Sequence, residues 1–453
     1  MILLKNATIV SADKEGIGSI LIDGEKIKKV FWHNDGPQSP ENNGPQNEDL
    51  PEGTEVIDLT GKHIIAGGID AHVHFREPGL THKADISTES RAAVAGGVTT
   101  VFDMPNTNPA TTSTQALAEK IELAKGKSLA KIAFHIGATN SNAEEICRLI
   151  EEGDAATGLK ESDVPGIKIF MGSSTGNMLV NDQETLPQLF NITSKPILVH
   201  CEDEQTIKLQ LEAAIEKYGD NIPFEEHENI RSRLACIRSC IKALEYATMF
   251  ESKLTVCHIS TKEEINMVNA AKAYNKDITA ETSCNYLWFT NADYARLGSK
   301  VKCNPSVKTA EDRQALREAL RDGQIDTIGS DHAPHLLSEK DAPYAKAPSG
   351  LPTIQQSLPV LLTVAKQEDI PLTRIASVFS EKASEIYALD RGKIKAGMKA
   401  DLVVFDYDKT FTVKAEDQYS KCGWTPYEGE VLNGCIETVY IDGKKVLENG
   451  RII

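Results

Sequence analysis

The sequence predicts an α/β protein built on a (β/α)8 barrel, with a small β-sandwich domain formed by both ends of the chain. Two observations predict the barrel: short β-rich segments occur eight times between residues 64 and 330, and helical patterns separate most of them. A third observation predicts the small domain, because residues 1–63 and 391–453 contain only short strands and turns. We therefore assign 64–390 to the barrel and both terminal parts to the β-domain.

The predicted barrel strands are short apolar segments rich in residues that favour strands. They are expected at Ile64–Ile69, Thr99–Met104, Lys131–Ala138, Gly166–Phe170, Pro196–His200, Leu254–Ile259, Asp277–Thr282 and Asp326–Ser330. The clearest helical patterns between them cover Thr112–Ala124, Thr206–Tyr218, Ser232–Phe250 and Glu263–Tyr274.

The two ends of the chain show the pattern of a small sheet. Their strands are expected at Ile2–Leu4, Ala7–Val10, Gly18–Ile22, Lys28–Trp32, Asp401–Asp406, Thr412–Val413 and Glu437–Ile441. The segment Asn34–Gly53, rich in Asn, Gly, Pro and Glu, is expected to be a mobile loop that contributes little to a core.

Composition narrows the class of protein. The chain has 453 residues, 40% of them hydrophobic and 25% charged, as in ordinary globular proteins. The net charge of −17, without a basic block, argues against nucleic acid as a partner. Neither a signal peptide nor an apolar run of roughly 18 residues is present, so we expect a cytoplasmic protein that makes no contact with a membrane. Nine scattered cysteines without a C-x-x-C motif fit reduced thiols.

The segment Gly68–Gly79 contains the most informative motif. His72, His74 and Arg76 alternate along the end of a predicted strand, so their side chains should share one face. Two imidazoles can form half of a zinc site, and a guanidinium beside them can bind an anion. Chance alone produces an H-x-H pair about 0.3 times in a chain of this composition. Two hydrogen-bonded core histidines are therefore the alternative for the pair taken alone.

Further metal-capable residues follow other barrel strands, where catalytic groups of such barrels lie. These are Lys168, His200, His258 and Asp331. Each has a structural alternative: a hydrogen-bonded histidine, a lysine that extends to the rim, or an aspartate that caps a helix. Five of eight strands ending in such groups is hard to explain by independent accidents, so the set predicts a metal centre.

Lys168 has a particular place in this prediction. A buried ammonium beside zinc would be unfavourable, which favours the neutral amine. A neutral amine can react with carbon dioxide to form a carbamate, an anion able to bridge two cations. Four histidines, Asp331 and a carbamate on Lys168 could then ligate two zinc ions.

The chain resembles the amidohydrolase superfamily, and within it the dihydroorotases, along nearly its whole length. The tail segment Gly397–Val403 is similar to the strand by which these enzymes return to their small β-domain. The other matching motifs are His72–Gly79, Asp103–Thr107, the strand with Lys168, Val199–Glu202, Cys257–Ser260 and Gly329–His335.

The resemblance implies a role for each site residue. His72, His74 and Asp331 would hold the more buried zinc, His200 and His258 the other, and carboxylated Lys168 with a hydroxide would bridge the two. Arg76, Asn106 and His335 would bind the substrate carboxylate. Asn304 and the backbone near Ser349–Leu351 would contact the pyrimidine ring.

The implied reaction is the reversible cyclisation of N-carbamoyl-L-aspartate to L-dihydroorotate in pyrimidine biosynthesis. Hydroxide activated by two zinc ions would attack the ring carbonyl, and Asp331 would pass the proton to the departing nitrogen. Because ring closure needs a protonated carboxyl group, acidic conditions should favour dihydroorotate. Arg76 would suit an anionic substrate, whereas dihydropyrimidinases and hydantoinases act on rings that lack a carboxylate.

Several alternatives stay open at the level of sequence. Arg76 could instead form a structural salt bridge with Glu77, Asp103 or Asp331, Asn106 could be a turn residue, and His335 could support another ligand. Allantoinase activity, or an inactive scaffold homologue, would fit the same fold. A homodimer is possible on the resemblance. The segment Leu336–Pro352 could be a lid or a static loop, and Cys422–Gly429 is expected to be structural.

Overall fold

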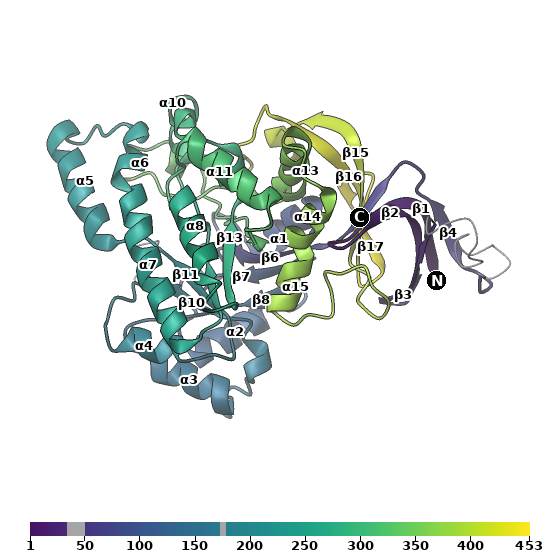
Figure 1. Ribbon diagram of the computed structural model, residues 1–453, viewed down its shortest axis with the longest axis horizontal. Helices are drawn as coiled ribbons and strands as arrows, with labels where there is room; N and C mark the ends of the chain where they lie inside the picture. Colours follow the sequence, from purple (N-terminus) through teal and green to yellow (C-terminus); the bar gives the residue numbers. More distant parts are fainter. Residues whose placement is uncertain (34–49, 173–177) are drawn as a thin grey trace.

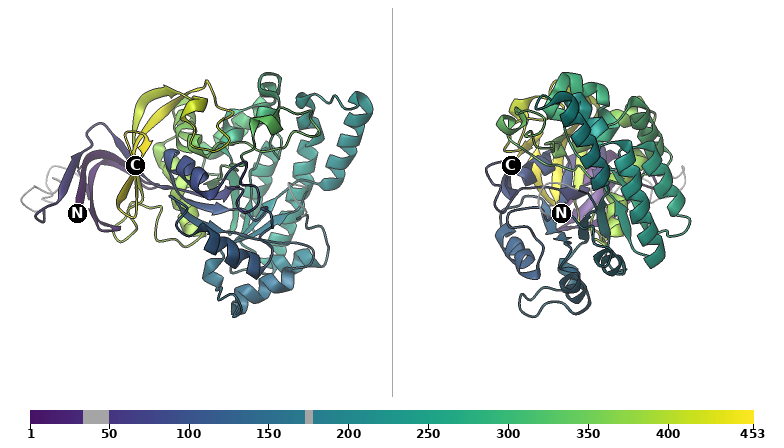
Figure 2. Two further views of the ribbon diagram at one scale, coloured as in Figure 1. Left: turned by 180° about the vertical axis from the view of Figure 1, so that it is seen from behind. Right: turned by 90° about the vertical axis from the view of Figure 1, so that its left-hand side faces the viewer.

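The computed structural model describes residues 1–33, 50–172 and 178–453, and most of the loop expected at Asn34–Gly53 lies outside them. Helices surround a barrel of parallel strands at one end of the molecule, and a curved sheet that contains both termini lies at the other (Figure 1). The further views show the same two-part arrangement (Figure 2). No helix among the described residues has the length and apolar character needed to span a membrane.

The barrel is formed by parallel strands in chain order, which confirms the predicted (β/α)8 fold. The strand expected at Lys131–Ala138 is interrupted at His135, so that its first part pairs with β7 and its second with β10. A parallel bridge between Val73 and His332 joins the last strand position to the first, and the His74 N–H donates to His332 O at 2.8 Å. The strands are β6 (Gly68–Val73), β7 (Val98–Asp103), β8 (Lys131–Phe134), β9 (Ile136–Gly137), β10 (Ile167–Phe170), β11 (Ile197–His200), β12 (Leu254–Val256), β13 (Ile278–Thr282) and β14 (Thr327–Ile328).

The helices around the barrel begin where the sequence supplies caps. Thr261 and Glu264 form a capping box at α8, Thr309 and Asp312 form another at α11, and the Asp203 side chain caps α5. The four helices expected from periodicity correspond to α2, α5, α7 and α8. The α-helices are α1 (Ile86–Ala95), α2 (Thr114–Ala124), α3 (Ala143–Glu152), α4 (Thr185–Phe190), α5 (Glu204–Tyr218), α6 (His227–Ile230), α7 (Arg233–Phe250), α8 (Lys262–Ala271), α9 (Cys284–Trp288), α10 (Tyr294–Leu297), α11 (Ala310–Arg321), α12 (Leu337–Lys340), α13 (Ser357–Gln367), α14 (Leu372–Ala376) and α15 (Lys382–Ile386).

Both ends of the chain contribute to one nine-stranded sheet, as expected. Its order is β18-β17-β16-β15-β5-β1-β2-β3, with β4 paired to β1. Apolar side chains from β1, β2, β5 and β15 form a small core of their own. The strands are β1 (Ile2–Val10), β2 (Glu15–Asp23), β3 (Lys26–Trp32), β4 (Glu55–Asp58), β5 (His63–Ala66), β15 (Leu402–Thr412), β16 (Val431–Ile441), β17 (Lys444–Glu448) and β18 (Arg451–Ile452).

Several predicted strands differ from the observed ones; Asp401–Asp406 and Thr412–Val413, for example, correspond to the single strand β15. The strand expected at Ile64–Ile69 divides at Gly67: β5 pairs with β1 and β15 in the terminal sheet, and only β6 enters the barrel. A Cβ atom at Gly67 would overlap the Thr99 side chain, so glycine is what allows the chain to pass between the two parts. The segments Ile2–Leu4 and Ala7–Val10 form a single strand, which a bulge interrupts.

The core of the terminal sheet should contribute measurably to stability. Leu402 is fully buried in it, whereas Val431 on the neighbouring strand β16 is 57% exposed. Replacement of Leu402 by Ala should cost about 2–5 kcal/mol and lower the midpoint of thermal unfolding by several degrees. The control Val431→Ala should change stability by no more than about 0.5 kcal/mol. Equal melting curves for both variants, measured by calorimetry, would contradict this packing.

Candidate metal centre and substrate pocket

One cavity lies beyond the carboxyl ends of the barrel strands. All six residues predicted as metal ligands line it, from five different strands or the loops that follow them. Arg76, Asn304, Ser349 and Gly350, which were predicted to contact substrate, line the same cavity. Its complete lining is His72, His74, Arg76, Lys168, Phe170, His200, His258, Asn304, Asp331, Ala333, Ser349 and Gly350.

His72, His74 and Asp331 form the first half of the centre. Their ligand atoms lie within 4.8 Å of one another, close enough to share one ion. The Asp331 Oδ1 atom is 3.0 Å from His74 Nε2 and 3.5 Å from His72 Nε2. The backbone of Asp331 is left-handed, with φ of 47°, which a non-glycine residue rarely adopts. Arg76 (68°) and His258 (40°) share this conformation, and such backbones are concentrated at functional sites.

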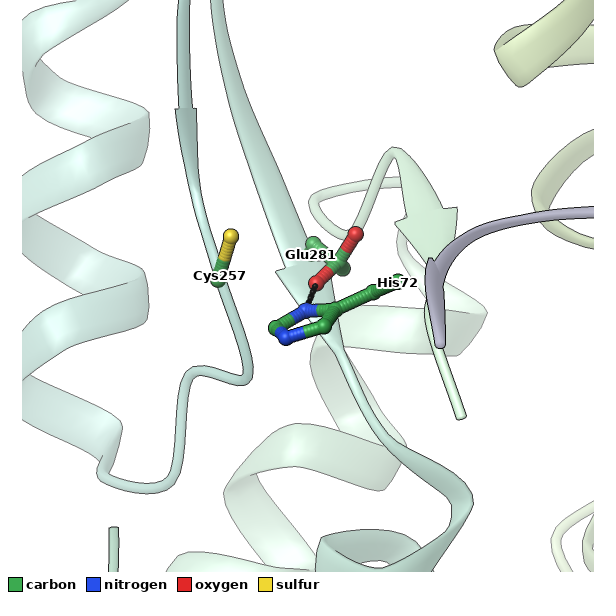
Figure 3. A group of neighbouring side chains, drawn as sticks. All are labelled: His72, Cys257 and Glu281. Carbon is green, nitrogen blue, oxygen red and sulfur yellow. Dashed lines mark hydrogen bonds and ion pairs between the residues drawn. The ribbon is translucent and has the colours of Figure 1, made fainter. Parts of the chain in front are cut away.

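The Nδ1 atoms of His72 and His74, which point away from Asp331, are hydrogen-bonded to other side chains. His72 Nδ1 lies 2.7 Å from Glu281 Oε1, and His74 Nδ1 lies 2.6 Å from Asn106 Oδ1 (Figure 3 shows the Glu281 contact). Each Nδ1 is then the protonated nitrogen, so each Nε2 directs a lone pair at the Asp331 carboxylate. Two acceptors facing a third acceptor repel one another unless a cation lies among them. The arrangement therefore fits a metal ion.

His200 and His258 form the second half of the centre. His200 Nε2 lies 2.9 Å from Glu202 Oε2, which in turn binds the Arg231 guanidinium at 2.5 Å. The other nitrogen of His200, Nδ1, faces His258 Nε2 at 2.9 Å. Because the His200 Nε2–H donates a hydrogen bond to Glu202, the Nδ1 atom carries no proton and offers a lone pair to the cavity.

The protonation states of these groups also suit metal binding. Burial lowers the pKa values of His72, His200 and His258, so these imidazoles are neutral. Burial alone would raise the pKa of Asp331, but the adjacent imidazoles of His74 and His72 lower it overall, so the carboxylate is ionised. Burial raises the pKa of Glu281 to about 7, and Lys168 opposes that shift. Neutral imidazole and ionised carboxylate are the forms that bind metals.

Lys168 lines the cavity and is completely buried. Its Nζ donates to Cys257 Sγ at 3.5 Å and forms no ion pair with a carboxylate of the described chain. Cys257 lies close enough to His72 and Glu281 to form a second candidate metal group (Figure 3). Burial raises the pKa of the Cys257 thiol, so it keeps its proton and is a poor metal ligand.

Arg76 is only 3% exposed, and it has no carboxylate partner within the described residues. The three carboxylates considered from sequence are engaged elsewhere: Glu77 with Lys127, Asp103 with Lys120, and Asp331 with His74. Burial lowers the pKa of Arg76 to about 10, which leaves it a cation at neutral pH. A salt bridge with any of the three is therefore not its role.

Of the other residues predicted to bind substrate, Asn106 and His335 lie near Arg76, and Asn304 lies in the cavity where the substrate ring was predicted to bind. Asn106 and His335 line, with Arg76, a second cavity that adjoins the first. Arg76 Nη2 lies 3.0 Å from His335 Nε2, and its Nε donates to Pro334 O at 3.1 Å. Asn304 Oδ1 is buried and has no hydrogen-bond partner among the residues that the structure describes, which leaves an acceptor for a ligand.

The loop at Leu336–Pro352 is held by two buried lysines. Lys340 Nζ donates to the carbonyls of Lys302, Pro348 and Gly350, and Lys302 Nζ donates to those of Tyr344 and Ala347. These five hydrogen bonds favour a static loop over a lid. The segment Cys422–Gly429 packs beside it, where Trp424 Nε1 donates to His335 O at 2.8 Å.

Sequence reasoning missed the groups that hold the histidines. Glu281 is the penultimate residue of β13, a strand that was predicted, so a search for any carboxylate near a strand end would have found it. Glu202 lies in a recognised motif but received no role. The contact between Lys168 and Cys257 joins two strands and leaves no signal in either one.

Comparison with known proteins assigns the chain to a family. The model of the amidohydrolase family matches residues 63–446. The chain belongs to the amidohydrolase family. This membership confirms the expected hydrolase.

Named relatives within this family include several dihydroorotases. That of Methanosarcina acetivorans is 36% identical over 386 residues, which cover 83% of this chain and 79% of that protein. That of Clostridium acetobutylicum is 31% identical over 456 residues, or 99% and 100% of the two chains. An allantoinase of Desulfitobacterium hafniense is also 31% identical, over 100% of this chain and 96% of that one. The solved L-hydantoinase (dihydropyrimidinase) of Arthrobacter aurescens superposes with a TM-score of 0.90 at 26% identity, over 100% and 97% of the two chains.

The contact between Glu281 and His72 predicts a loss of metal affinity on mutation. Glu281→Gln should weaken zinc binding by about 10–100-fold, because the amide cannot fix the His72 tautomer as the carboxylate does. Equilibration against a competing chelator followed by metal analysis measures this. Glu264→Gln is a matched control: Glu264 is equally buried, its pKa is also raised to about 7 by burial, and it caps α8 away from the cavity. Unchanged affinity in Glu281→Gln would contradict the role.

Proposed function

We propose that this amidohydrolase is a dihydroorotase, which interconverts N-carbamoyl-L-aspartate and L-dihydroorotate in de novo pyrimidine biosynthesis. One observation carries the choice: Arg76 is a buried cation in the cavity, and no described carboxylate neutralises it. A substrate carboxylate would satisfy it with paired hydrogen bonds. The dihydroorotase names among the relatives support the same choice.

We propose two zinc ions per chain as the cofactor. His72, His74 and Asp331 would hold one, and His200 and His258 the other. When bound, zinc would supply Lewis acidity that lowers the pKa of water and polarises the amide carbonyl. Burying the Lys168 ammonium is costly, which favours loss of its proton. The neutral amine could then react with carbon dioxide, with release of a second proton, to form a carbamate anion that would serve as a metal ligand.

The protein's own groups would then orient the substrate and move the proton. Arg76, with Asn106 and His335 beside it, would hold the carboxylate at the edge of the cavity. Asn304 and the backbone at Ser349 and Gly350 would contact the ring. The Asp331 carboxylate, ionised before reaction, would accept a proton from the attacking water and deliver it to the departing amide nitrogen. Reversal of these steps closes the ring.

Free thiols at all nine cysteines suit a reducing cytoplasm, where we place the reaction. The partner in this proposal is a small-molecule substrate. Allantoinase and hydantoinase activity are the competing assignments, because relatives with those names match the whole chain. An assay with allantoin, hydantoin and dihydrouracil beside dihydroorotate separates them. Turnover of these rings without turnover of dihydroorotate would overturn the proposal.

Arg76 should determine activity on the anionic substrate. Arg76→Met should lower kcat/KM for dihydroorotate by about a hundredfold, because a charge-assisted hydrogen-bonded contact is lost. Zinc content should stay at the wild-type value, since Arg76 contacts none of the proposed ligands. Lys127→Met, which breaks an ion pair with the adjacent Glu77, is the control and should keep most of the activity. Equal loss in both variants would point to general destabilisation.

Carboxylation of Lys168 should make metal loading depend on carbon dioxide. Metal-free protein prepared without bicarbonate should take up less zinc and recover less activity than the same protein supplied with bicarbonate. Lys168→Met should bind less zinc and should not respond to bicarbonate. Metal analysis and the dihydroorotate assay together measure this. A wild-type protein whose zinc uptake ignores bicarbonate would contradict the carbamate but leave the histidine ligands in place.

A further inference from the structure

His335 lies between two cations, and this arrangement has a consequence for the substrate pocket. Lys83 Nζ is 3.0 Å from His335 Nδ1 on one side of the ring. On the other side, His335 Nε2 is 3.0 Å from Arg76 Nη2 and 3.0 Å from the Ser349 carbonyl oxygen. Burial, followed by the charges of Arg76 and Lys83, lowers the pKa of the ring, so His335 carries a single proton.

The three contacts do not all suit the same tautomer. An ammonium can only donate, so the contact with Lys83 requires an unprotonated Nδ1 and places the proton on Nε2. That Nε2–H can donate to Ser349 O, and two of the three contacts are then satisfied. With the proton on Nδ1, the contact with Arg76 would be satisfied, but the ring would oppose the ammonium of Lys83. Glu339 Oε2 lies 3.8 Å from Nδ1, too far to accept a hydrogen bond from it. The neighbours therefore select the Nε2–H form.

The position of Lys83 is itself well determined. Its Nζ binds Glu339 Oε1 at 2.9 Å, and its side chain is 14% exposed. The Lys83 N–H donates to Leu80 O at 3.0 Å, and the backbone carbonyl of His335 accepts the Trp424 indole N–H at 2.8 Å. Both partners of the contact are thus held by bonds outside it.

The Nε2–H form leaves Arg76 without an acceptor at that point. Arg76 Nη2 and His335 Nε2 are then two donors 3.0 Å apart, which repel each other unless an acceptor lies near both. Because the His335 Nε2–H donates to Ser349 O, the Arg76 N–H is the donor that stays available to an anionic oxygen of the substrate. In the other tautomer, His335 would accept the hydrogen bond of Arg76 and compete with the substrate.

We propose that Lys83 is a positioning residue that holds His335 in its Nε2–H tautomer, so that His335 does not accept a hydrogen bond from Arg76 and the Arg76 N–H stays available to a substrate anion. Lys83 itself contacts neither the reacting atoms nor a proposed metal ligand. The role in substrate binding rests on the proposed function, whereas the tautomer does not. The two parts can therefore be tested separately.

The tautomer is measured by two-bond ¹H–¹⁵N correlation spectra of zinc-loaded protein with ¹⁵N-labelled histidine and no substrate. The His335 signals are those lost in His335→Gln. Wild type and Lys83→Arg, which keeps a donor, should show the Nε2–H pattern, and Lys83→Met should show the Nδ1–H pattern. Lys62→Met, which removes a lysine that pairs with Asp406 and Glu437 in the terminal sheet, should resemble wild type.

Steady-state kinetics with dihydroorotate tests the consequence for binding. Lys83→Met should raise KM by about tenfold with little change in kcat, because one charge-assisted interaction with the substrate is weakened. Lys83→Arg should restore most of the affinity, and Lys62→Met should keep the wild-type constants. A parallel fall in kcat and in melting temperature would indicate a merely structural role and overturn the proposal.

The remaining outcomes are decisive as well. An Nδ1–H pattern in wild type, or an Nε2–H pattern retained in Lys83→Met, overturns the inference whatever the activity. A tautomer change without a change in KM overturns the role in binding. If wild type does not turn over dihydroorotate but the tautomer change occurs, the proposed function fails and the assignment of the tautomer stands.

Discussion

The centre of this protein depends on outward hydrogen bonds from its histidine rings. Glu281, Asn106 and Glu202 each accept a hydrogen bond from the nitrogen of one ring that points away from the cavity. The nitrogen of that ring that faces the cavity therefore presents a lone pair. An ionised Asp331 adds further electron density at the same point. Such a convergence is unfavourable in the absence of positive charge, and it becomes favourable once cations are bound. The remainder of the barrel serves to bring these carboxylates and the amide to the backs of the rings.

The metal ligands and the substrate-binding groups come from different parts of the fold. The ligands stand at or just beyond the ends of barrel strands, where neighbouring backbones restrain them. The groups proposed to bind substrate lie on loops beyond the strands, and buried lysines and the tail segment with Trp424 hold the loop at His335–Pro352 in place. This separation explains how one fold can serve relatives that are named for different activities. Residues on the loops can change while the residues at the strand ends keep their positions.

Much of this could be predicted because the relevant signals are local. Strand and helix periodicity identified the barrel, and the spacing of His72, His74 and Arg76 identified one wall of the cavity, although the strand ends at Val73 and Arg76 lies beyond it with a left-handed backbone. Contacts between distant segments were not predictable from one sequence. Glu281 lies 209 residues from the ring that it holds, and Lys83 lies 252 residues from His335. The division of the first strand at Gly67 also escaped notice, because apolar residues continue on both sides and the break depends on the Thr99 side chain.

The position of β5 in the terminal sheet has a consequence for biosynthesis. This strand lies between β1, which precedes it in the chain, and β15, which begins more than three hundred residues later at Leu402. During translation, β5 therefore leaves the ribosome long before one of its two edges can be covered. An uncovered edge can pair with other chains. Nascent protein should thus be most prone to aggregation in the interval before β15 emerges, and a chaperone that shields strand edges would act in that interval.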